Sequence, residues 1–250
     1  MRRVERVLLG AYRCLAPEVE EVGSAVVMRW PQAPASSMLN RAVGLGVDRP
    51  ASEEDVDAVL GALAGTTLYV AVAPDAEPRQ LPGWLQARGL VPGWGWMVFR
   101  RGLSDPPAAR SGLRLEEVES REQAEAFARI ACVGFELPSA VEPLLAAAPQ
   151  AGWLCWLALD GDEPVSVAGM YVAEGAAYLS FAASLPEHRG KGGQSALMEA
   201  RIRRAGELGC DVALTETGEL RDGLPSNSYR NILRGGFEEL AVTANWLGHG

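Results

Sequence analysis

The sequence predicts an α/β protein with a mixed sheet, in which short apolar strands alternate with amphipathic helices. Apolar residues recur at alternate positions over short runs and at spacings of three and four over longer runs, which are the periods of strands and helices. Glycine follows helix-like runs directly before an apolar strand start, as at Gly89 and Gly236. With 48% hydrophobic and 22% charged residues, the 250-residue chain can bury a sizeable core, which excludes disordered, collagen-like and coiled-coil proteins.

A stretch without hydrophobic periodicity, residues 102–111, contains prolines and small residues and predicts a linker. We therefore expect two domains, residues 1–101 and residues 112–250.

The second domain divides into elements whose ends are marked by proline, glycine or turn-forming residues. The tripeptide Asp160-Gly161-Asp162 joins two of its strands as an antiparallel hairpin. One helix carries a stripe of Met198, Ile202 and Ala205. In chain order, the expected elements are strand 113–118, helix 122–133, a short helical piece within 143–149, strands 153–159, 165–172 and 177–185, helix 192–208, strand 212–217, helix 226–234 and strand 237–246.

The first domain repeats part of this order. A helix over 52–63 has an acidic first turn behind the capping residue Ser52. Residues 84–90 resemble residues 231–237, since each is a helix end closed by glycine before an apolar strand start, and we interpret this as a weak internal duplication. The expected elements are strand 37–44, helix 52–63, strand 66–72, helix 81–88 and strand 94–101.

The formal charge of −9 argues against a general nucleic-acid binder, and residues 111–250 carry the whole acidic excess. Residues 187–204 are locally basic, which favours either a discrete anionic ligand or a solvated helix face.

Cysteine and histidine are too sparse for a disulfide scaffold or a metal centre. The apolar runs are too short to span a membrane, and the first residues lack the apolar core of a signal peptide. We expect no metal, no membrane association and a cytoplasmic location with reduced thiols.

The segment that indicates chemistry is residues 185–197, where three glycines within four residues separate a strand from an amphipathic helix. Glycines let the backbone approach a ligand closely, and the helix N-terminus that follows carries about half a positive charge. This arrangement fits a pyrophosphate, with Arg189 and Lys191 at its rim. Lys191 is the only lysine of the chain.

The run resembles the acyl-CoA signature of the GNAT acetyltransferase superfamily, Arg/Gln-x-x-Gly-x-Gly/Ala after a strand that ends in proline. Arg189 and Gly192 match this signature, whereas Gln194 stands where the second glycine or alanine is expected. Residues 227–237 are similar to the closing helix of the family with its terminal Gly-Phe. The resemblance covers residues 112–250 and implies a GNAT fold there, with a reduced GNAT-like unit before it.

The resemblance implies a binding site for acetyl-CoA as co-substrate. The strand before Pro186 is expected to pair with the pantetheine amides, and the glycine loop to hold the pyrophosphate; the amide of Gln194 is expected to be able to donate to a phosphate oxygen. The residues carried over are Ser184, Leu185, Arg189, Gly190, Lys191, Gly192, Gly193, Gln194, Ser195, Ser228 and Asn231.

The reaction that the resemblance implies is direct attack of an amine on the thioester, which needs a general base and a general acid. Glu216, in a strand between two threonines, is the candidate base, although an edge position in solvent explains it equally. The family often places its acid where this chain has Ile232, so Tyr229 is the substitute candidate, with a place in the core as the alternative. His188 is a further possible base, or a residue that contacts CoA.

We therefore expect an N-acetyltransferase that acts on a small-molecule or peptide amine. The alternatives are a non-catalytic acyl-CoA-binding or interaction module, favoured by Ile232 and Gln194, and a structural domain without a ligand. The first domain lacks the glycine signature, and its acidic helix start would repel a pyrophosphate, so we expect it not to bind CoA. The sequence leaves the acceptor, the acyl length and the oligomeric state open.

Overall fold

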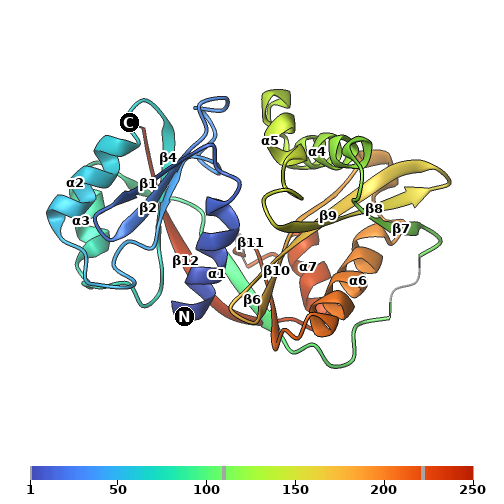
Figure 1. Ribbon diagram of the computed structural model, residues 1–250. Helices are drawn as coiled ribbons and strands as arrows, with labels where there is room; N and C mark the ends of the chain where they lie inside the picture. Colours follow the sequence, from blue (N-terminus) through green and yellow to red (C-terminus); the bar gives the residue numbers. More distant parts are fainter. Residues whose placement is uncertain (1, 109–110, 221–222, 250) are drawn as a thin grey trace. The chain divides into compact units, whose positions relative to one another are not determined.

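The computed structural model describes residues 2–108, 111–220 and 223–249, which form two compact units (Figure 1). Unit 1 comprises Met1–Val98, Thr217–Leu224 and Leu240–Gly250, and unit 2 comprises Phe99–Glu216 and Pro225–Glu239.

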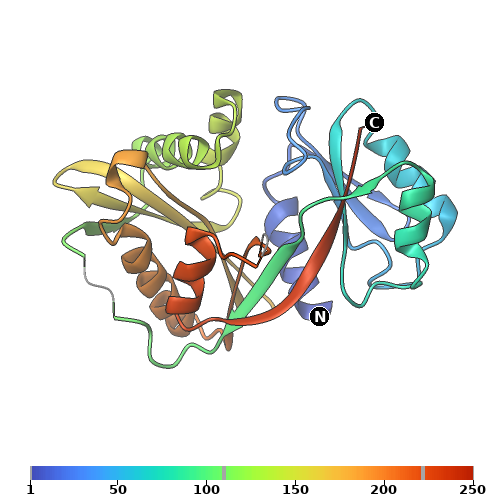
Figure 2. The ribbon, with the colours of Figure 1, turned by 180° about the vertical axis from the view of Figure 1, so that it is seen from behind.

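Unit 2 is built on strands in the order β11-β10-β9-β8-β7. Helices α4 and α6 both contact β8, β9 and β10, and they cover opposite faces of the sheet (Figure 2). From β7 onward, the elements along the chain are β7 (Arg114–Glu117), α4 (Arg121–Phe135), the 3-10 turn η1 (Ser139–Val141), α5 (Glu142–Ala146), β8 (Trp153–Asp160), β9 (Glu163–Ala173), β10 (Ala176–Ser184), the 3-10 turn η2 (Pro186–His188), α6 (Gly193–Glu207), β11 (Val212–Gly218), α7 (Asn227–Arg234) and β12 (Glu238–His249), most of which belongs to unit 1.

The order and type of the elements predicted for residues 112–250 are confirmed. Strands β8 and β9 pair antiparallel around the predicted turn at Gly161. Helix α4 begins behind Ser120, which forms a capping box with Gln123, and α7 begins behind Ser226, whose hydroxyl accepts from the backbone N–H of Tyr229. Local capping chemistry therefore sets these helix starts.

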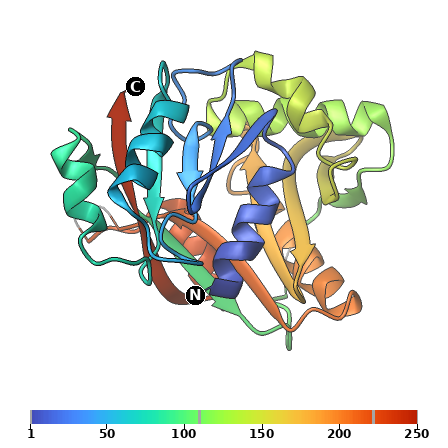
Figure 3. The ribbon, with the colours of Figure 1, turned by 60° about the vertical axis from the view of Figure 1, so that its left-hand side comes forward.

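Unit 1 has strands in the order β1-β2-β3-β4-β12, with helices on both faces (Figure 3). Helices α2 and α3 pack on one apolar face through Val56, Val59, Leu81 and Leu85, and α1 packs on the other through Leu9 and Tyr12. The elements are α1 (Arg2–Arg13), β1 (Glu18–Val22), β2 (Ala25–Arg29), β3 (Arg41–Val43), α2 (Glu53–Ala62), β4 (Thr67–Val72), α3 (Leu81–Ala87), β5 (Val91–Pro92) and β6 (Trp96–Arg101).

The strand directions support the predicted duplication. In unit 1, β1, β2 and β3 are successively antiparallel, α2 follows, and β4 returns parallel to β3. In unit 2, β8, β9 and β10 are successively antiparallel, α6 follows, and β11 returns parallel to β10. Helix α2 therefore corresponds to α6, the helix behind the glycine loop.

The strand expected over 37–44 is shorter in the structure, where β3 begins only at Arg41. The residues before β3 form a turn because the buried side chain of Asn40 is hydrogen-bonded to their backbone. Its side-chain amide donates to the carbonyls of Ala33 and Ser36, and its Oδ1 accepts from the backbone N–H of Trp30. These bonds satisfy backbone groups that an extended strand would pair across a ladder.

The boundaries of the compact units differ from the expected contiguous domains. Residues 240–250 belong to unit 1 because Ala244–His249 of β12 pair antiparallel with β4, from Val72 to Thr67. Residues 99–108, the first of which belong to β6, are part of unit 2.

A first prediction concerns Glu5 on α1, which is buried in unit 1. Burial, and then the charge of Asp75, raises the pKa of Glu5 from 4.5 to about 7. A raised pKa stabilises the fold below pH 4.5, and this stabilisation is lost as the pH rises through about 7. We expect Glu5→Gln to increase the free energy of unfolding relative to wild type at pH 8 but not at pH 5, by up to about 3 kcal/mol.

Urea unfolding at both pH values measures this difference, with Glu20→Gln on the exposed face of β1 as the control. An equal effect of Glu5→Gln at both pH values would contradict the prediction.

Candidate functional site

Strands β10 and β11 of unit 2 separate part-way along β10. They pair in parallel only from Ala176 to Leu179, and β10 then continues to Ser184 without a partner in β11. The hydroxyl of Thr215 donates to the carbonyl of Leu179 at 2.8 Å, where the pairing ends. The separation leaves one edge of β10 free to bond a ligand with its backbone.

A β-bulge lies within this free part of β10. The register with β9 pairs Ser180 with Gly169 and Ala183 with Val167, so two residues of β10 stand opposite one of β9. Phe181, at φ +52°, turns its ring onto Trp153, with the ring centroids 4.8 Å apart. Gly169 gives these rings room, because a Cβ at that position would lie 3.0 Å from Phe181 and 3.1 Å from Trp153 and would force one of them to shift.

The glycine loop leads from β10 into α6 in the conformation that only glycine adopts readily. Gly190 has φ +80° and Gly192, the N-cap residue of α6, has φ +84°. Gly193 begins the helix so close to β9 that a Cβ would lie 2.6 Å from Oγ of Ser166. The loop therefore presents backbone N–H groups at the positive end of a helix, which is suited to an anion.

Gln194 does not direct its amide nitrogen to the loop. Nε2 donates to the carbonyl of Ala183 at 2.6 Å and also lies within bonding distance of Ser184 Oγ and Val167 O. The expectation was that this amide could donate to a phosphate oxygen, but in the structure it ties α6 to Val167 of β9 and to Ala183 near the end of β10. These two backbone carbonyls lie within reach of the amide, and a bond to it satisfies them.

Lys191 is also engaged at the rim of the loop. Its Nζ lies 3.3 Å from Oδ2 of Asp160 and 3.2 Å from Nδ1 of His188, and that histidine nitrogen lies 3.5 Å from the same carboxylate. Arg189 is exposed, with an extended backbone. Of the two predicted rim cations, Lys191 is thus partly neutralised by a carboxylate.

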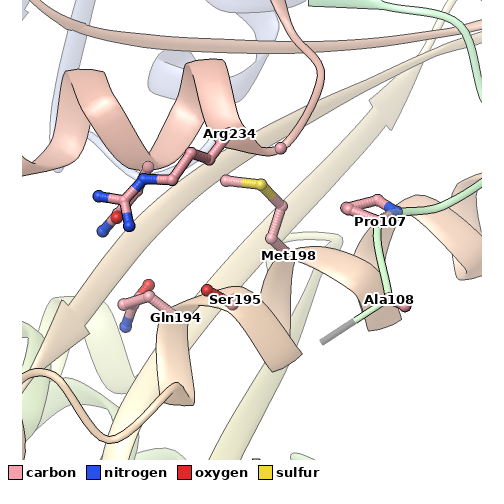
Figure 4. A pocket seen from close by; sticks show the side chains of 8 residues that line it. Pro107, Ala108, Gln194, Ser195, Met198 and Arg234 are labelled. Atoms are coloured by element: carbon pink, nitrogen blue, oxygen red, sulfur yellow. The ribbon is translucent and has the colours of Figure 1, made fainter. Parts of the chain in front are cut away.

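A pocket of about 200 Å³ lies between the first turns of α6 and the end of α7 (Figure 4). It brings together three predicted residues, Gln194, Ser195 and Asn231. Sequence reasoning missed the others, which are Pro107, Ala108, Met198, Arg234 and Gly235. Figure 4 shows Gln194, Ser195 and Met198 of α6 facing Arg234 of α7.

The walls of this pocket are brought together by a glycine at the end of α7 and by the side chain of Arg101. Gly235 allows α7 to approach α6, because a Cβ there would lie 2.3 Å from Sδ of Met198. Residues 102–108 are held in place by the guanidinium of Arg101, which donates to the carbonyls of Ser104, Asp105 and Gly235. The expected linker therefore forms one wall of the pocket through Pro107 and Ala108.

Glu216 lies near the end of β11, on the strand that diverges from β10. The hydroxyl of Tyr178, which is fully buried on β10, donates to Oε1 of Glu216 at 3.0 Å. Tyr178 also packs against Trp153, and this contact fixes its ring. Glu216 as a whole is half-buried, and the bond from Tyr178 orients its carboxylate.

Tyr229 is buried on α7, and its ring meets Phe99 edge to face at 4.9 Å. Its hydroxyl donates to Oε1 of Glu239 at 2.5 Å. Burial, and then this bond, raises the pKa of Tyr229 to about 12, which makes it a weaker acid. These surroundings favour a structural role for Tyr229, and Ile232 on the same helix is buried as well.

A second prediction follows for Tyr229→Phe. We expect the free energy of unfolding to fall by about 1–2 kcal/mol, since a bond to a charged group is lost, and turnover to stay within about 3-fold of wild type. Glu239→Gln should reproduce the loss of stability. A fall in kcat of about 100-fold or more with stability intact would instead identify Tyr229 as the general acid.

The other predicted residues lie around the pocket and the free strand edge. Ser184 ends β10, Leu185 caps the turn η2, and Ser228 is exposed in the first turn of α7, outside the pocket lining. In the described part of the chain, no three metal-ligating side chains gather, and no helix is long and apolar enough to cross a membrane.

The family comparison matches residues 118–222 to the acetyltransferase (GNAT) family. The match contains the separated strands, the glycine loop and α6. A search of curated proteins finds no match to this chain.

Solved structures match over nearly the whole chain. A GCN5-related N-acetyltransferase from Kribbella flavida is 22% identical, with a TM-score of 0.71, over 100% of this chain and 95% of that one. A tandem GNAT protein from the clavulanic acid biosynthesis pathway, solved without AcCoA, is 16% identical, with a TM-score of 0.62, over 96% of this chain and 86% of that one. A GNAT-family protein from Novosphingobium aromaticivorans is 16% identical, with a TM-score of 0.61, over 99% and 98%. These likenesses show the fold, and the second supports a tandem arrangement.

Proposed function

Because residues 118–222 form a domain of the acetyltransferase (GNAT) family, we propose that the protein transfers an acetyl group from acetyl-CoA to an amine. The observation that carries this proposal is the separation of β10 from β11 beside the glycine loop. A free strand edge binds a chain of amides, and a helix N-terminus binds a pyrophosphate. An acyl-CoA carries both of these groups, because its pantetheine amides and its pyrophosphate are joined in one molecule.

The residues of unit 2 fit this ligand. The backbone of Ser184 pairs with pantetheine, and the N–H groups of the loop from Gly190 to Ser195 hold the pyrophosphate. Leu185, which the resemblance also placed against pantetheine, instead donates its N–H to the carbonyl of Val165 and accepts from the N–H of His188. Close approach needs glycine at positions 190, 192 and 193, where two residues have positive φ and the third has no room for a Cβ. Asn231 and Arg234 in the pocket add a polar group and a cation for the nucleotide part.

In the reaction, the amine nitrogen bonds to the thioester carbonyl carbon, and the carbon–sulfur bond breaks. Glu216 accepts the proton that the amine loses, either directly or through a water molecule. The leaving thiolate takes a proton from water and departs as the CoA thiol, and Glu216 gives up the proton it accepted to the hydroxide that remains, which restores the carboxylate. Tyr178 acts by holding the carboxylate of Glu216 in one orientation.

Unit 1 has no comparable anion site at the corresponding helix. The start of α2 is closed by its own carboxylate, because Asp55 accepts from the backbone N–H of Ser52 and pairs with Arg49 at 2.8 Å. The bond from Arg49 is the main cause that lowers the pKa of Asp55, so the carboxylate stays charged. We propose that unit 1 does not bind CoA.

Calorimetric titration of the full chain with acetyl-CoA tests the proposal, followed by CoA-thiol release with a panel of cationic amines and peptide N-termini. Micromolar binding with release for at least one acceptor is the expected result. If acetyl-CoA binds but no acceptor leads to release of the CoA thiol, the alternative of a non-catalytic acyl-CoA-binding module is favoured. That alternative is suggested by Ile232, which stands where the family often has a tyrosine. The absence of binding would contradict the proposal.

A further inference from the structure

The guanidinium of Arg201 is buried in unit 2, and it has no role in the proposed reaction. It lies on α6 with 1% of its surface exposed, among the largest fully buried side chains of the protein. A buried charge is costly unless its donors are bonded. Burial lowers the pKa of Arg201 to about 9, which reflects this cost.

The donors of Arg201 are bonded to backbone carbonyls. Nε donates to its own helix, to the carbonyl of Leu197 at 3.0 Å. Nη1 crosses to the sheet and donates to the carbonyl of Gly169 on β9 at 2.9 Å and to that of Ser180 on β10 at 3.1 Å. The side chain thus joins α6 to two neighbouring strands at one point.

This point is the start of the bulge. Gly169 and Ser180 are the last pair before the register shifts, and the next pair is Val167 with Ala183. A bulge interrupts the ladder, so that carbonyls beside it lack their usual N–H partners. Nη1 of Arg201 supplies a donor to both carbonyls from the side of α6.

The bulge also begins where β10 leaves β11. Leu179 is the last residue of β10 that pairs with β11, and Ser180–Ser184 form the free edge. The path of this edge therefore depends on how the bulge is held. A small displacement of a binding element reduces affinity and rate strongly.

We propose that Arg201 is a positioning residue that holds the bulge of β10 and thereby the edge that binds acyl-CoA. The inference rests on the proposed function, since that function supplies the ligand of the edge. Arg201 itself touches no substrate.

The test compares Arg201→Met with two controls on α6. Arg203→Met changes the same residue type on the exposed face, where Arg203 pairs with Glu199. Ile202→Ala removes apolar packing at the adjacent buried position, and neither isoleucine nor alanine has a side-chain donor for the bulge carbonyls. The readouts are amide hydrogen exchange, the Kd for acetyl-CoA and the Tm.

In Arg201→Met, we expect amides of residues 180–184 to exchange about 10-fold faster and the Kd for acetyl-CoA to rise about 10-fold or more. Arg203→Met should match wild type in both. Ile202→Ala should lower the Tm and leave the Kd unchanged at temperatures where it is folded. Unchanged exchange and Kd in Arg201→Met would overturn the proposal, as would an equal rise in Kd for Ile202→Ala.

Arg201→Lys is measured in the same way and decides the question if Arg201→Met does not fold, because lysine keeps the charge but not the fork of donors. The exchange readout needs no ligand. If wild type does not bind acetyl-CoA, the proposed function fails, while the exchange at 180–184 still tests whether Arg201 holds the bulge.

Discussion

Gly192→Glu is expected to weaken acetyl-CoA binding by about 100-fold or more, equivalent to about 2.7 kcal/mol. The new carboxylate stands at the N-cap of α6, where it competes for the N–H groups of the loop and repels the pyrophosphate. A carboxylate at a helix N-terminus is favourable for the helix itself. The cost to the fold is then mainly the left-handed conformation of residue 192, about 1–2 kcal/mol.

Two controls separate charge from strain. Gly192→Ala carries the same backbone strain without the charge, so its effect on binding should be much smaller. Gly206→Glu places the same charge near the other end of α6, where a Cβ meets nothing within 4 Å, and should bind as wild type does. Calorimetric titration with acetyl-CoA and the Tm of each variant provide the data. Wild-type affinity in Gly192→Glu would show that the loop is not the phosphate site.

Glu216→Gln is expected to lower kcat by about 100-fold or more, with the Kd for acetyl-CoA unchanged, because the amide cannot accept the proton of the attacking amine. Tyr178→Phe should lower kcat less, by about 10-fold, since it removes only the hydrogen bond that orients Glu216. Release of the CoA thiol, measured with an acceptor from the amine panel, is the assay.

Glu207→Gln is the matched control, as Glu207 lies on α6 in an exposed pair with Arg204. Its kcat should equal that of wild type. Retention of wild-type kcat in Glu216→Gln would remove Glu216 as the base and direct attention to His188 beside the loop.

The parts of the fold that could be predicted are those in which several local signals coincide. Helix α2 combines apolar periodicity with the capping box of Ser52 and Asp55, and the structure places its ends within a residue of the prediction. In contrast, α1, β1 and β2 were not predicted. Strand β1 has four exposed residues and only Val22 buried, so it lacks the alternation that identifies a strand.

The candidate site could be located from the sequence, but the directions of its side chains could not. Three glycines between a strand and a helix define the loop without knowledge of the fold. Gln194 donates to the carbonyls of Ala183 and Val167, which are more than ten residues away in the sequence. Arg234 and Pro107 reach the pocket only because α7 and the segment after Arg101 are folded against α6. Such contacts follow from tertiary structure, which periodicity and capping do not report.

The pairing of β4 with the last strand has a consequence for biosynthesis. Thr67 meets His249, a contact across 182 positions of the chain. During synthesis, β1 to β4 emerge before β12, so the sheet of unit 1 lacks this strand until residues 244–249 have been made. Residues 111–220 have emerged by then. Closing so long a loop costs entropy, and an already compact intervening segment lowers that cost. The sheet of unit 1 thus cannot be completed before the residues of unit 2 have been made, and until then the edge of β4 is open to pairing with other chains.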